Sequence, residues 1–461
     1  MLREAKDTIA AIATPIGEGG IAVIRVSGSL AIEAADRVFR GSRPLSSAKS
    51  HTIHYGKIIT DRGDLVDDVL VSVFKNPHSY TGEDSVEISC HGSYYVSQKI
   101  LETVIASGAR LADPGEFTQR AFLNGRMDLM QAEAVADLIH SKTALAHKAS
   151  MEQLNGRLSA EINSIRQNLI ELCSLLELEL DFAEEGIKLS DKEKILSVFD
   201  ETITDIKKLI DSYRFGKLVR DGVKVVLAGS PNVGKSSLLN ALLQENRAIV
   251  SDIPGTTRDV IEESIAINGV VFRFVDTAGL RETSDHVEKE GVRRSNSQIE
   301  SSDIILLVVD AADPSLAEKG ASKVFDVVES YGEKVLIVYN KIDLLPNGHN
   351  IKWPYNSAAV LISCLTKEGI EELTNKIYQR AVTNFDSNSS SVKIQSSRHQ
   401  ELLRKCLSSV VSAKSSQVDD LGGELVAVDL RIALDYLGEI VGLTTSDDVL
   451  NSIFSNFCIG K

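Results

Sequence analysis

The sequence has few cysteines and no closely spaced pair of them. Its five thiols are odd in number and widely scattered, and its nine histidines show no metal-ligand spacing. Disulfide frameworks and structural zinc sites depend on closely spaced ligands such as C-x-x-C pairs. The sequence therefore argues against both classes of site for its cysteines, which are Cys90, Cys173, Cys364, Cys406 and Cys458.

Long hydrophobic runs are also missing. No stretch of about 18 apolar residues, the length needed to span a bilayer, occurs in the chain. The N-terminal segment 1–15 lacks the apolar core of a secretory signal. A hydrophobic fraction of 43% with 25% charged residues is typical of a soluble globular protein. We therefore expect a cytoplasmic protein without membrane association.

Basic residues are fewer than acidic residues. The chain has 50 Lys and Arg against 65 Asp and Glu, which gives a net charge of −15. Non-specific nucleic-acid binders gain affinity by neutralising phosphates, so this balance argues against that class. RNA remains open as a ligand, because a local basic patch or a partner protein can supply the phosphate contacts.

Hydrophobic periodicity divides the first part of the chain. A length of 461 residues favours two or three domains. Before residue 120, short alternating runs predict strands at 19–28, 65–74 and 85–92, with a helix at 30–39. From about residue 121 the apolar residues recur every three or four positions. This pattern predicts one long helix through residues 151–176.

The middle of the chain has a different pattern. Apolar runs there predict buried parallel strands that alternate with helices, at 223–229, 271–279, 303–313 and 334–343. A polar stretch at 386–392 predicts a linker, and helical periodicity returns at 402–411 and 430–441. We expect a doubly wound α/β domain inserted into a helical bundle that both flanks build. Three domains in series are the alternative.

A phosphate-binding loop opens this middle domain. Residues 229–236 read GSPNVGKS, which fits G-x-x-x-x-G-K-[ST] between a predicted strand and the helical run 237–243. The glycines of such a loop let backbone N–H groups wrap phosphates at a helix N-terminus. Lys235 is expected to reach the β- and γ-phosphates, and the Ser236 hydroxyl to ligate Mg²⁺. If this motif is considered by itself, a glycine-rich turn with a purely structural role is the alternative.

Two further motifs supply the magnesium and γ-phosphate contacts. GTTRD at 255–259 offers Thr257 as a second magnesium ligand in a switch loop. Asp276 ends a predicted strand and can hold the magnesium ion through water, and the Gly279 N–H can sense the γ-phosphate.

The guanine motif follows in the expected order. Residues 340–343 read NKID, and the Asp343 carboxylate can accept from both the N1–H and the 2-amino group of guanine, a pairing that adenine cannot offer. Ser363 and Cys364 then form a base-contacting turn. These motifs together predict a GTP-binding domain.

The whole chain resembles the MnmE (TrmE) family of tRNA-modification GTPases. The segments that carry this resemblance are GEFTQRAFLNGRMDLMQAEAVADLI (115–139), the phosphate loop with Asn232, GTTRD, DTAGLRE (276–282) and the terminal FCIGK (457–461). The resemblance implies a Ras-like P-loop G domain inserted into a helical bundle, preceded by an α+β folate-binding dimerisation domain. The expected division is 1–120 for this first domain, 121–215 and 381–461 for the helical domain, and 216–380 for the G domain.

The expected GTP-binding residues follow from these motifs and this resemblance. They are Gly229, Asn232, Val233, Gly234, Lys235, Ser236, Ser237, Ser251, Asp252, Ile253, Pro254, Gly255, Thr256, Thr257, Asp276, Thr277, Ala278, Gly279, Asn340, Lys341, Asp343, Ser363 and Cys364. Cys364 departs from the usual alanine of the last motif, where a backbone N–H makes the contact.

Leu280 stands where Ras-like enzymes carry a water-orienting glutamine. The resemblance implies that K⁺ does part of this work, with Asn232 as side-chain ligand and Ser251, Ile253 and Thr256 completing its cage. A fixed positive charge beside the β–γ bridge stabilises the transition state as an arginine finger does. This cage is ordered in the family when two G domains meet, which implies a homodimer.

Glu288 matches the family's catalytic glutamate, which orients the nucleophile through a bridging water. Taken without the resemblance, Glu288 is more readily a solvated charge at a helix start.

The resemblance also implies a tetrahydrofolate site. Arg25, Glu87, Arg126 and Lys461 match positions that hold formyl-tetrahydrofolate. A pterin presents donor nitrogens that suit Glu87, and the glutamate tail of folate suits Arg126, where family members often carry lysine. Without the resemblance each of the four is better explained as a surface ion-pair residue.

Three interpretations compete for Cys458. A lipidation box is a poor match, because Gly460 is not aliphatic and Lys461 is terminal in the sequence. A buried apolar thiol beside Phe457 and Ile459 is the commonest fate of such a cysteine. The resemblance implies a catalytic thiol near the modification centre, as nucleophile or general acid.

The implied function is a potassium-activated, dimerisation-dependent GTPase that modifies C5 of the wobble uridine, U34, in certain tRNAs. Methylene-tetrahydrofolate supplies one carbon, and glycine or ammonia completes a carboxymethylaminomethyl or aminomethyl group. The resemblance implies an FAD-dependent partner, MnmG (GidA), in a heterotetramer or larger complex, and the lack of a G-x-G-x-x-G fingerprint in this chain is compatible with that. The alternative is a ribosome-assembly GTPase, although residues 392–450 lack a GxxG loop and a basic stripe.

Overall fold

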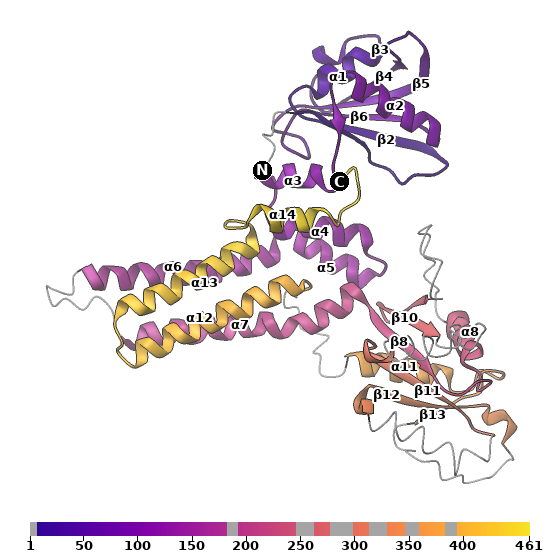
Figure 1. The fold of residues 1–461 in the computed structure, drawn as a ribbon, viewed down its shortest axis with the longest axis vertical. Helices are drawn as coiled ribbons and strands as arrows, with labels where there is room; N and C mark the ends of the chain where they lie inside the picture. Colours follow the sequence, from indigo (N-terminus) through magenta and orange to yellow (C-terminus); the bar gives the residue numbers. More distant parts are fainter. Residues whose placement is uncertain are drawn as a thin grey trace, which may run out of the picture. The chain divides into compact units, whose positions relative to one another are not determined.

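The computed structural model describes residues 7–181, 192–245, 262–276, 298–312, 330–345, 359–382 and 394–461. The chain divides into two compact units (Figure 1). The first unit comprises Met1–Ala136, Glu152–Ile206 and Glu401–Lys461, and the second comprises Asp137–Met151 and Lys207–Gln400. Segments from both flanks of the middle domain therefore fold together in the first unit.

A seven-stranded sheet with the order β3-β4-β5-β6-β2-β1-β7 dominates the N-terminal part of the first unit. Its pairs are antiparallel except for β1 with β7. The strands are β1 (Ile9–Ile12), β2 (Gly19–Ser27), β3 (Phe39–Gly41), β4 (Thr52–Ile59), β5 (Leu65–Phe74), β6 (Ser85–Gly92) and β7 (Arg110–Leu111).

Helices α1 (Ala31–Val38) and α2 (Tyr94–Ala106) cover one face of this sheet. The core between them contains the fully buried Ile24, Val71 and Ile88. Side chains alternate between the faces of a strand, so Arg25 and Glu87 lie on the face opposite the core. These two residues are direct neighbours across the β2–β6 ladder.

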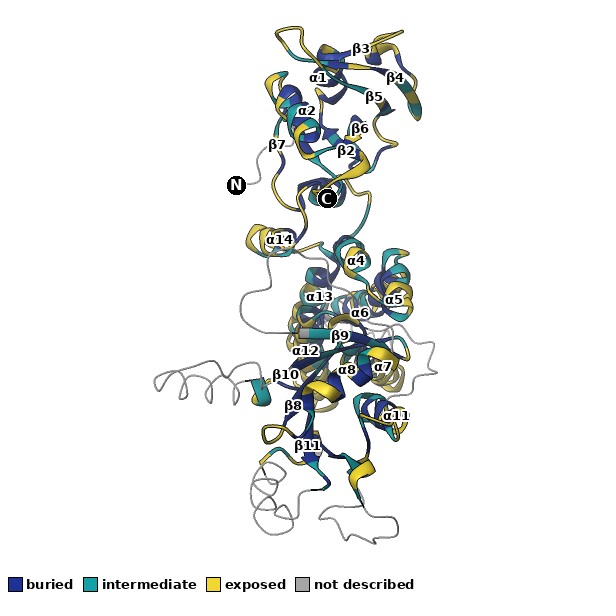
Figure 2. Ribbon diagram, turned by 90° about the vertical axis from the view of Figure 1, so that its right-hand side faces the viewer, coloured by how far each residue is buried: buried dark blue, intermediate teal, exposed yellow. Residues whose placement is uncertain are grey.

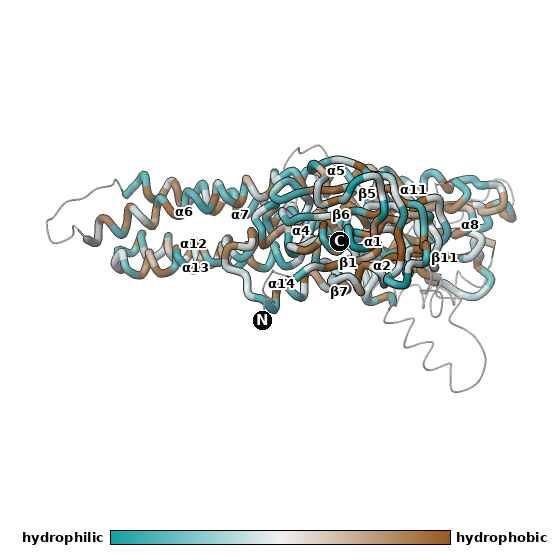
Figure 3. The backbone as a smooth tube through the Cα atoms, turned by 90° about the horizontal axis from the view of Figure 1, so that it is seen from above, coloured by the Kyte–Doolittle hydropathy of each residue, from teal (hydrophilic) through white to brown (hydrophobic). Residues whose placement is uncertain are grey.

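The helical part of the first unit is built from distant segments of the chain. Helices α6 and α13 lie side by side, and an ion pair between Glu177 and Arg431 joins them at 2.5 Å. Figure 3 shows hydrophobic and hydrophilic residues alternating along α6, as expected for a helix with one buried face. Apart from the helices that pack on the two sheets, the described α-helices are α3 (Glu116–Leu123), α4 (Leu129–His140), α5 (Ala144–Leu154), α6 (Arg157–Asp181), α7 (Lys192–Asp221), α12 (Ser397–Val418), α13 (Gly423–Val441) and α14 (Asp447–Phe454).

One helix prediction differs from the structure, and one expected domain boundary falls within a helix. The expected single helix through 151–176 is wrong, because α5 ends at Leu154 and α6 begins at Arg157. Gly156 between them has φ +78°, a left-handed conformation that terminates a helix. The expected domain boundary between 215 and 216 falls inside α7, which continues to Asp221. The expected linker at 386–392 lies outside the described residues.

The second unit contains a six-stranded sheet with the order β13-β12-β11-β8-β10-β9. All its pairs are parallel except β9 with β10 at the edge. The strands are β8 (Val223–Ala228), β9 (Glu262–Ile267), β10 (Val270–Asp276), β11 (Ile304–Asp310), β12 (Val335–Asn340) and β13 (Ala359–Leu361). Its helices include α8 (Lys235–Glu245) and α11 (Ile370–Val382), and the short 3₁₀ turns Gly332–Lys334 and Ile342–Leu344 flank β12.

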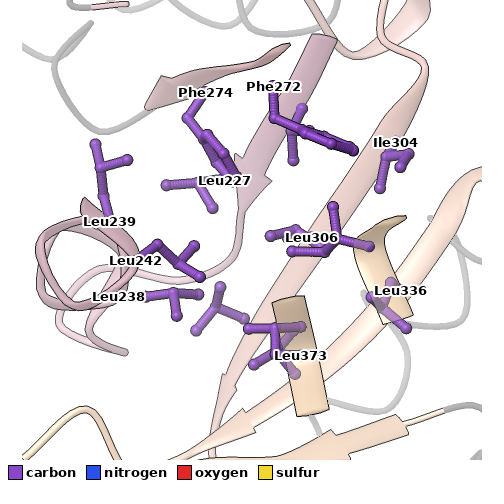
Figure 4. Packing of buried hydrophobic residues seen from close by; sticks show 14 of the residues in the cluster. Leu227, Leu238, Leu239, Leu242, Phe272, Phe274, Ile304, Leu306, Leu336 and Leu373 are labelled. Carbon is purple, nitrogen blue, oxygen red and sulfur yellow. The ribbon is translucent and has the colours of Figure 1, made fainter. Parts of the chain in front are cut away.

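Buried apolar side chains pack on both faces of this sheet. Figure 2 shows β8 and β11 as buried strands, which is why the sequence has near-continuous apolar runs there. On one face, Leu306 and Phe272 pack with Leu238 of α8 and Leu373 of α11 (Figure 4). This packing fixes the start of α8, and the phosphate loop immediately precedes that start. None of the described helices is both long enough and apolar enough to cross a membrane.

Candidate functional site: a nucleotide loop and a second polar cluster

The phosphate loop connects β8 to α8 and depends on two glycines. Gly229 has φ +140°, and a Cβ there would lie 2.2 Å from the Val308 carbonyl oxygen. Gly234 has φ +97°, and a Cβ there would lie 2.3 Å from Asn340 Nδ2. Neither space admits a side chain, so the loop lies directly against β11 and the end of β12.

Lys235 begins α8 and is buried, with 7% of its surface exposed. Its Nζ donates to the carbonyl oxygens of Gly229 at 3.0 Å and Ser230 at 2.9 Å. The ammonium charge therefore lies within the loop at a helix N-terminus, where anionic phosphate is favoured. Ser236 and Ser237 follow on the exposed first turn of α8.

Asn340 connects the phosphate loop to the base-contacting turn. Its side chain is buried, and Nδ2 donates to the Val233 carbonyl oxygen at 2.9 Å. Its Oδ1 accepts from the Cys364 N–H at 3.2 Å. One side chain therefore sets the spacing between the two halves of the nucleotide site.

Lys341 and Asp343 extend these connections. Lys341 has φ +69°, and its Nζ donates to the Asn232 carbonyl oxygen at 2.9 Å and to Asp310 Oδ2 at 2.5 Å. Asp343 Oδ1 accepts from the Ser363 hydroxyl at 2.5 Å. The guanine motif is thereby joined to the phosphate loop on one side and to the last turn on the other.

Cys364 lies in that last turn with a protonated thiol at neutral pH. Burial raises the pKa of this thiol to about 11, the hydrogen bond to Asn340 opposes the rise, and the charge of Asp343 adds to it. The Cys364 backbone N–H also donates to Asn340 Oδ1, and any residue except proline supplies that donor. The departure from alanine at this position therefore leaves the contact intact.

The remaining expected nucleotide residues are only partly described. Asp276 is the last residue of β10 and pairs in register with Leu227 of β8, two residues before the loop. The expected switch and cation residues, Ser251, Asp252, Ile253, Pro254, Gly255, Thr256, Thr257, Thr277, Ala278, Gly279 and Glu288, lie outside the described residues, as does Leu280.

A second polar cluster lies on the face of the N-terminal sheet opposite α1 and α2. Arg25 Nε and Nη2 both lie 2.9 Å from Glu87 Oε1. Arg25 Nη1 donates to the Gly460 carbonyl oxygen at 3.4 Å. The structure therefore brings three segments that are far apart in the sequence, β2, β6 and the C-terminal tail, to one guanidinium.

Two aromatic rings hold Arg25 in place. Its Cζ lies 5.3 Å from the Tyr80 ring centroid and 5.7 Å from that of Phe117, within cation–π range. The Tyr80 hydroxyl is hydrogen-bonded to Thr118 at 2.9 Å, and burial raises its pKa. Sequence reasoning missed both rings, because an aromatic residue without a motif is more readily a core residue.

Of the other two expected folate-binding residues, Lys461 interacts electrostatically with this cluster and Arg126 lies in a separate turn. Burial lowers the pKa of Lys461, and the charge of Arg25 lowers it further, while Glu87 opposes the shift. Arg126 has an exposed side chain in the turn after α3, and its Cγ lies beside Gly82. Lys461 therefore shares the electrostatic environment of Arg25 and Glu87, and we find no direct contact of Arg126 with that pair among the described residues.

The C-terminal tail has a fixed path. Gly460 has φ +94°, and a Cβ there would lie 2.5 Å from the Ile12 carbonyl oxygen. The Cys458 carbonyl oxygen accepts from the backbone N–H of Gly115 and of Lys461. Phe457 is buried and Cys458 is exposed, which excludes the alternative of a buried apolar thiol. No group of three or more potential metal ligands occurs among the described His, Cys, Asp and Glu residues.

Comparisons with known proteins cover nearly the whole chain. A family model described as "MnmE helical domain" matches residues 129–458, and one described as "GTP-binding protein TrmE N-terminus" matches residues 8–126. Proteins named tRNA modification GTPase MnmE match from Carboxydothermus hydrogenoformans (46% identity, 99% of this chain and 100% of the relative) and Clostridioides difficile (44% identity, 99% of each). The solved G domain of the T. maritima FeoB iron transporter matches 34% of this chain and 98% of its own, with 30% identity and a TM-score of 0.25.

Proposed function

This chain belongs to the MnmE family of tRNA modification GTPases, and on that premise we propose that potassium activates its GTP hydrolysis, which drives modification of wobble uridine. GTP hydrolysis in tRNA modification is the activity of the family. The proposal concerns the activating cation, the one-carbon donor, the partner and the modified position.

One observation supports the nucleotide part of this proposal above others. Asn340 and Lys341 hydrogen-bond to two consecutive carbonyl groups of the phosphate loop, those of Val233 and Asn232. A nucleotide whose base meets Asp343 and whose phosphates meet the loop would therefore bind to a connected frame. The Asp343 carboxylate selects guanine, since adenine lacks the two donors.

Magnesium fits the same loop. Ser236 lies in the first turn of α8 and is exposed. Ser236, Thr257 and, through water, Asp276 would hold the ion. When bound, it neutralises charge on the β- and γ-phosphates. Lys235 adds a fixed positive charge on the protein side.

Potassium is the proposed substitute for the glutamine that Leu280 replaces. Asn232 is exposed at the top of the loop, and its backbone has φ +64°. With a nucleotide bound, the Asn232 amide oxygen would ligate a monovalent cation beside the phosphates. Ser251, Ile253 and Thr256 would complete the ion's cage, and Glu288 would orient the water. Closure of two G domains in a homodimer would order these groups.

Tetrahydrofolate is the proposed ligand of the second cluster. Glu87 is partly exposed beside the anchored Arg25, so its second oxygen can accept from pterin nitrogens. Lys461 supplies a neighbouring amine, and Arg126 would meet the folate tail. We propose 5,10-methylene-tetrahydrofolate as the one-carbon donor, with 5-formyl-tetrahydrofolate as a ligand of the same site. The exposed Cys458 thiol would act near the transferred carbon.

The proposed product is a carboxymethylaminomethyl or aminomethyl group at C5 of U34. Oxidation and reduction in this chemistry require a flavin, which an FAD-dependent MnmG (GidA) partner would hold in a heterotetramer or larger complex. The acidic chain, with its net charge of −15, is compatible with a partner that supplies many of the tRNA phosphate contacts.

A complementation experiment tests this proposal against a ribosome-assembly role. A strain without the gene is complemented with wild type, Glu87→Gln or Glu33→Gln, and U34 nucleosides and ribosome profiles are measured. Glu33 is the matched control, since it forms an exposed ion pair with Arg37 in the same unit. We expect Glu87→Gln alone to lose the modification, with normal ribosome profiles and GTP turnover. Normal U34 modification in Glu87→Gln would contradict the folate assignment, and a ribosome defect in the deletion strain with modified U34 would favour the alternative.

A further inference from the structure

The ammonium of Lys341 bridges two segments of the nucleotide site. Its Nζ lies 2.5 Å from Asp310 Oδ2 and donates to the Asn232 carbonyl oxygen at 2.9 Å. The two charged side chains are 32% and 19% exposed, so water shields this pair only in part. The ion pair therefore connects the end of β11 to the phosphate loop.

The Asp310 carboxylate is itself held in one orientation. Its Oδ1 accepts from the Ala312 N–H at 3.0 Å, while Oδ2 pairs with Lys341. The Ala311 N–H donates to the Asn340 carbonyl oxygen at 2.7 Å, which fixes the end of β11 against the end of β12. A carboxylate held at both oxygens restricts the lysine that it pairs with.

Asn232 is the residue that this arrangement restrains. Its φ of +64° is a left-handed conformation, which residues with a side chain adopt uncommonly and asparagine more often than most. The hydrogen bond from Lys341 to its carbonyl oxygen helps to hold that conformation. The direction of the Asn232 side chain therefore depends on where the Lys341 ammonium lies.

We propose that Asp310 is a positioning residue for cation-stimulated hydrolysis, which acts through Lys341 on the backbone of Asn232. This inference rests on the proposed function, in which Asn232 ligates K⁺. Asp310 lies in neither the phosphate-loop motif nor the guanine motif, and it contacts neither nucleotide nor cation in this account.

The test is the potassium dependence of GTP turnover in full-length Asp310→Asn. This change removes the charge and keeps an oxygen that can accept from Ala312. At saturating GTP and constant ionic strength, we expect the half-saturating K⁺ concentration to rise about three- to tenfold, as loss of a partly shielded ion pair allows. GDP affinity, measured separately by fluorescence titration, should change less.

Asp303→Asn is the matched control. Asp303 lies at the other end of β11, where its Oδ2 also accepts a backbone N–H, that of Lys224, at 2.8 Å. Its charge and hydrogen-bonding pattern resemble those of Asp310, but it is remote from the loop. We expect wild-type potassium dependence in this variant.

A double-mutant cycle with Lys341→Met separates positioning from general structural damage. If Asp310 acts through Lys341, Asp310→Asn adds no further shift in the Lys341→Met background. An unchanged half-saturating K⁺ concentration in Asp310→Asn, or a full shift in the Lys341→Met background, would overturn the inference. Wild-type turnover that is equally fast in sodium would instead refute the potassium proposal itself, so the two failures are distinguishable.

Discussion

At the scale of single residues, Gly234 shows how closely the nucleotide loop fits its neighbours. The space that a Cβ would need at this position is occupied by the Asn340 amide, which lies 2.3 Å away. That amide also holds the Val233 carbonyl oxygen. An added methyl group would therefore displace the connection between the phosphate loop and the guanine motif, in addition to straining a left-handed backbone.

We predict that Gly234→Ala lowers GDP affinity by at least about tenfold, the loss expected when a strained, closely packed loop must shift. Titration with a fluorescent GDP analogue measures this affinity. Gly332→Ala is the control, because Gly332 also has positive φ but no heavy atom lies within 4 Å of its Cβ position. Equal GDP affinity in the two variants would mean that the Asn340 contact is not needed for binding.

The sequence predicts the roles of residues that belong to a spaced motif, but not of residues that act through contacts with distant parts of the chain. Gly229, Lys235 and Asp343 stand at fixed spacings, so the sequence predicts their role as a group. Tyr80 and Asp310 carry no such spacing, and their partners Arg25 and Lys341 lie 55 and 31 residues away. Such contacts depend on which distant segments become neighbours in the folded chain, and a single sequence does not reveal this.

At the scale of elements, the sequence predicts strands with several alternating residues better than it predicts very short strands or a break within a helix. The strands at 65–74 and 85–92 match β5 and β6, because each alternates over several residues. The prediction omitted β1 and β7, which have four and two residues and are defined by their neighbours. Periodicity also runs across Gly156 without a change, so it concealed the break between α5 and α6.

Burial of Cys406 makes the stability of the helical part depend on pH. Cys406 is fully buried in α12, and burial raises its pKa from 9.0 to about 12. The folded state keeps the proton after the unfolded chain has lost it. The stability that this thiol contributes is therefore complete below about pH 9 and is lost as the pH rises toward 12.

We predict that Cys406→Ala flattens the alkaline loss of stability, by at most about 1.4 kcal/mol per pH unit relative to wild type. Denaturant unfolding followed by circular dichroism, from about pH 8 to about pH 11, measures the two slopes. Cys458→Ala is the control, because that thiol is exposed. Parallel slopes in wild type and Cys406→Ala would contradict the prediction.

At the scale of the whole molecule, the two polar clusters belong to different compact units. The phosphate loop lies in the second unit, and the Arg25 cluster lies in the first with the C-terminal tail. A substitution in the C-terminal tail should therefore impair the modification chemistry and leave GTP turnover unchanged. Gly460 suits this test, since a Cβ there would meet the Ile12 carbonyl oxygen and displace the carbonyl group that contacts Arg25.

We predict that Gly460→Ala lowers U34 modification by at least about tenfold, because small misplacements of reacting groups cost that much. Potassium-stimulated GTP turnover should stay near wild type. Nucleoside analysis of tRNA from complemented strains and a phosphate-release assay measure the two quantities. Gly63→Ala, in the same unit with positive φ and open space, is the control. Normal U34 modification in Gly460→Ala would remove the tail from the proposed site.

The potassium dependence of GTP turnover tests the central claim most directly. Turnover is measured in potassium and in sodium, at equal ionic strength, for wild type and for Asn232→Ala. We predict that wild type is at least about tenfold faster in potassium, the effect expected of a fixed charge at the transition state. Asn232→Ala should bind GTP and lose this difference. Equal wild-type rates in the two salts would contradict the account.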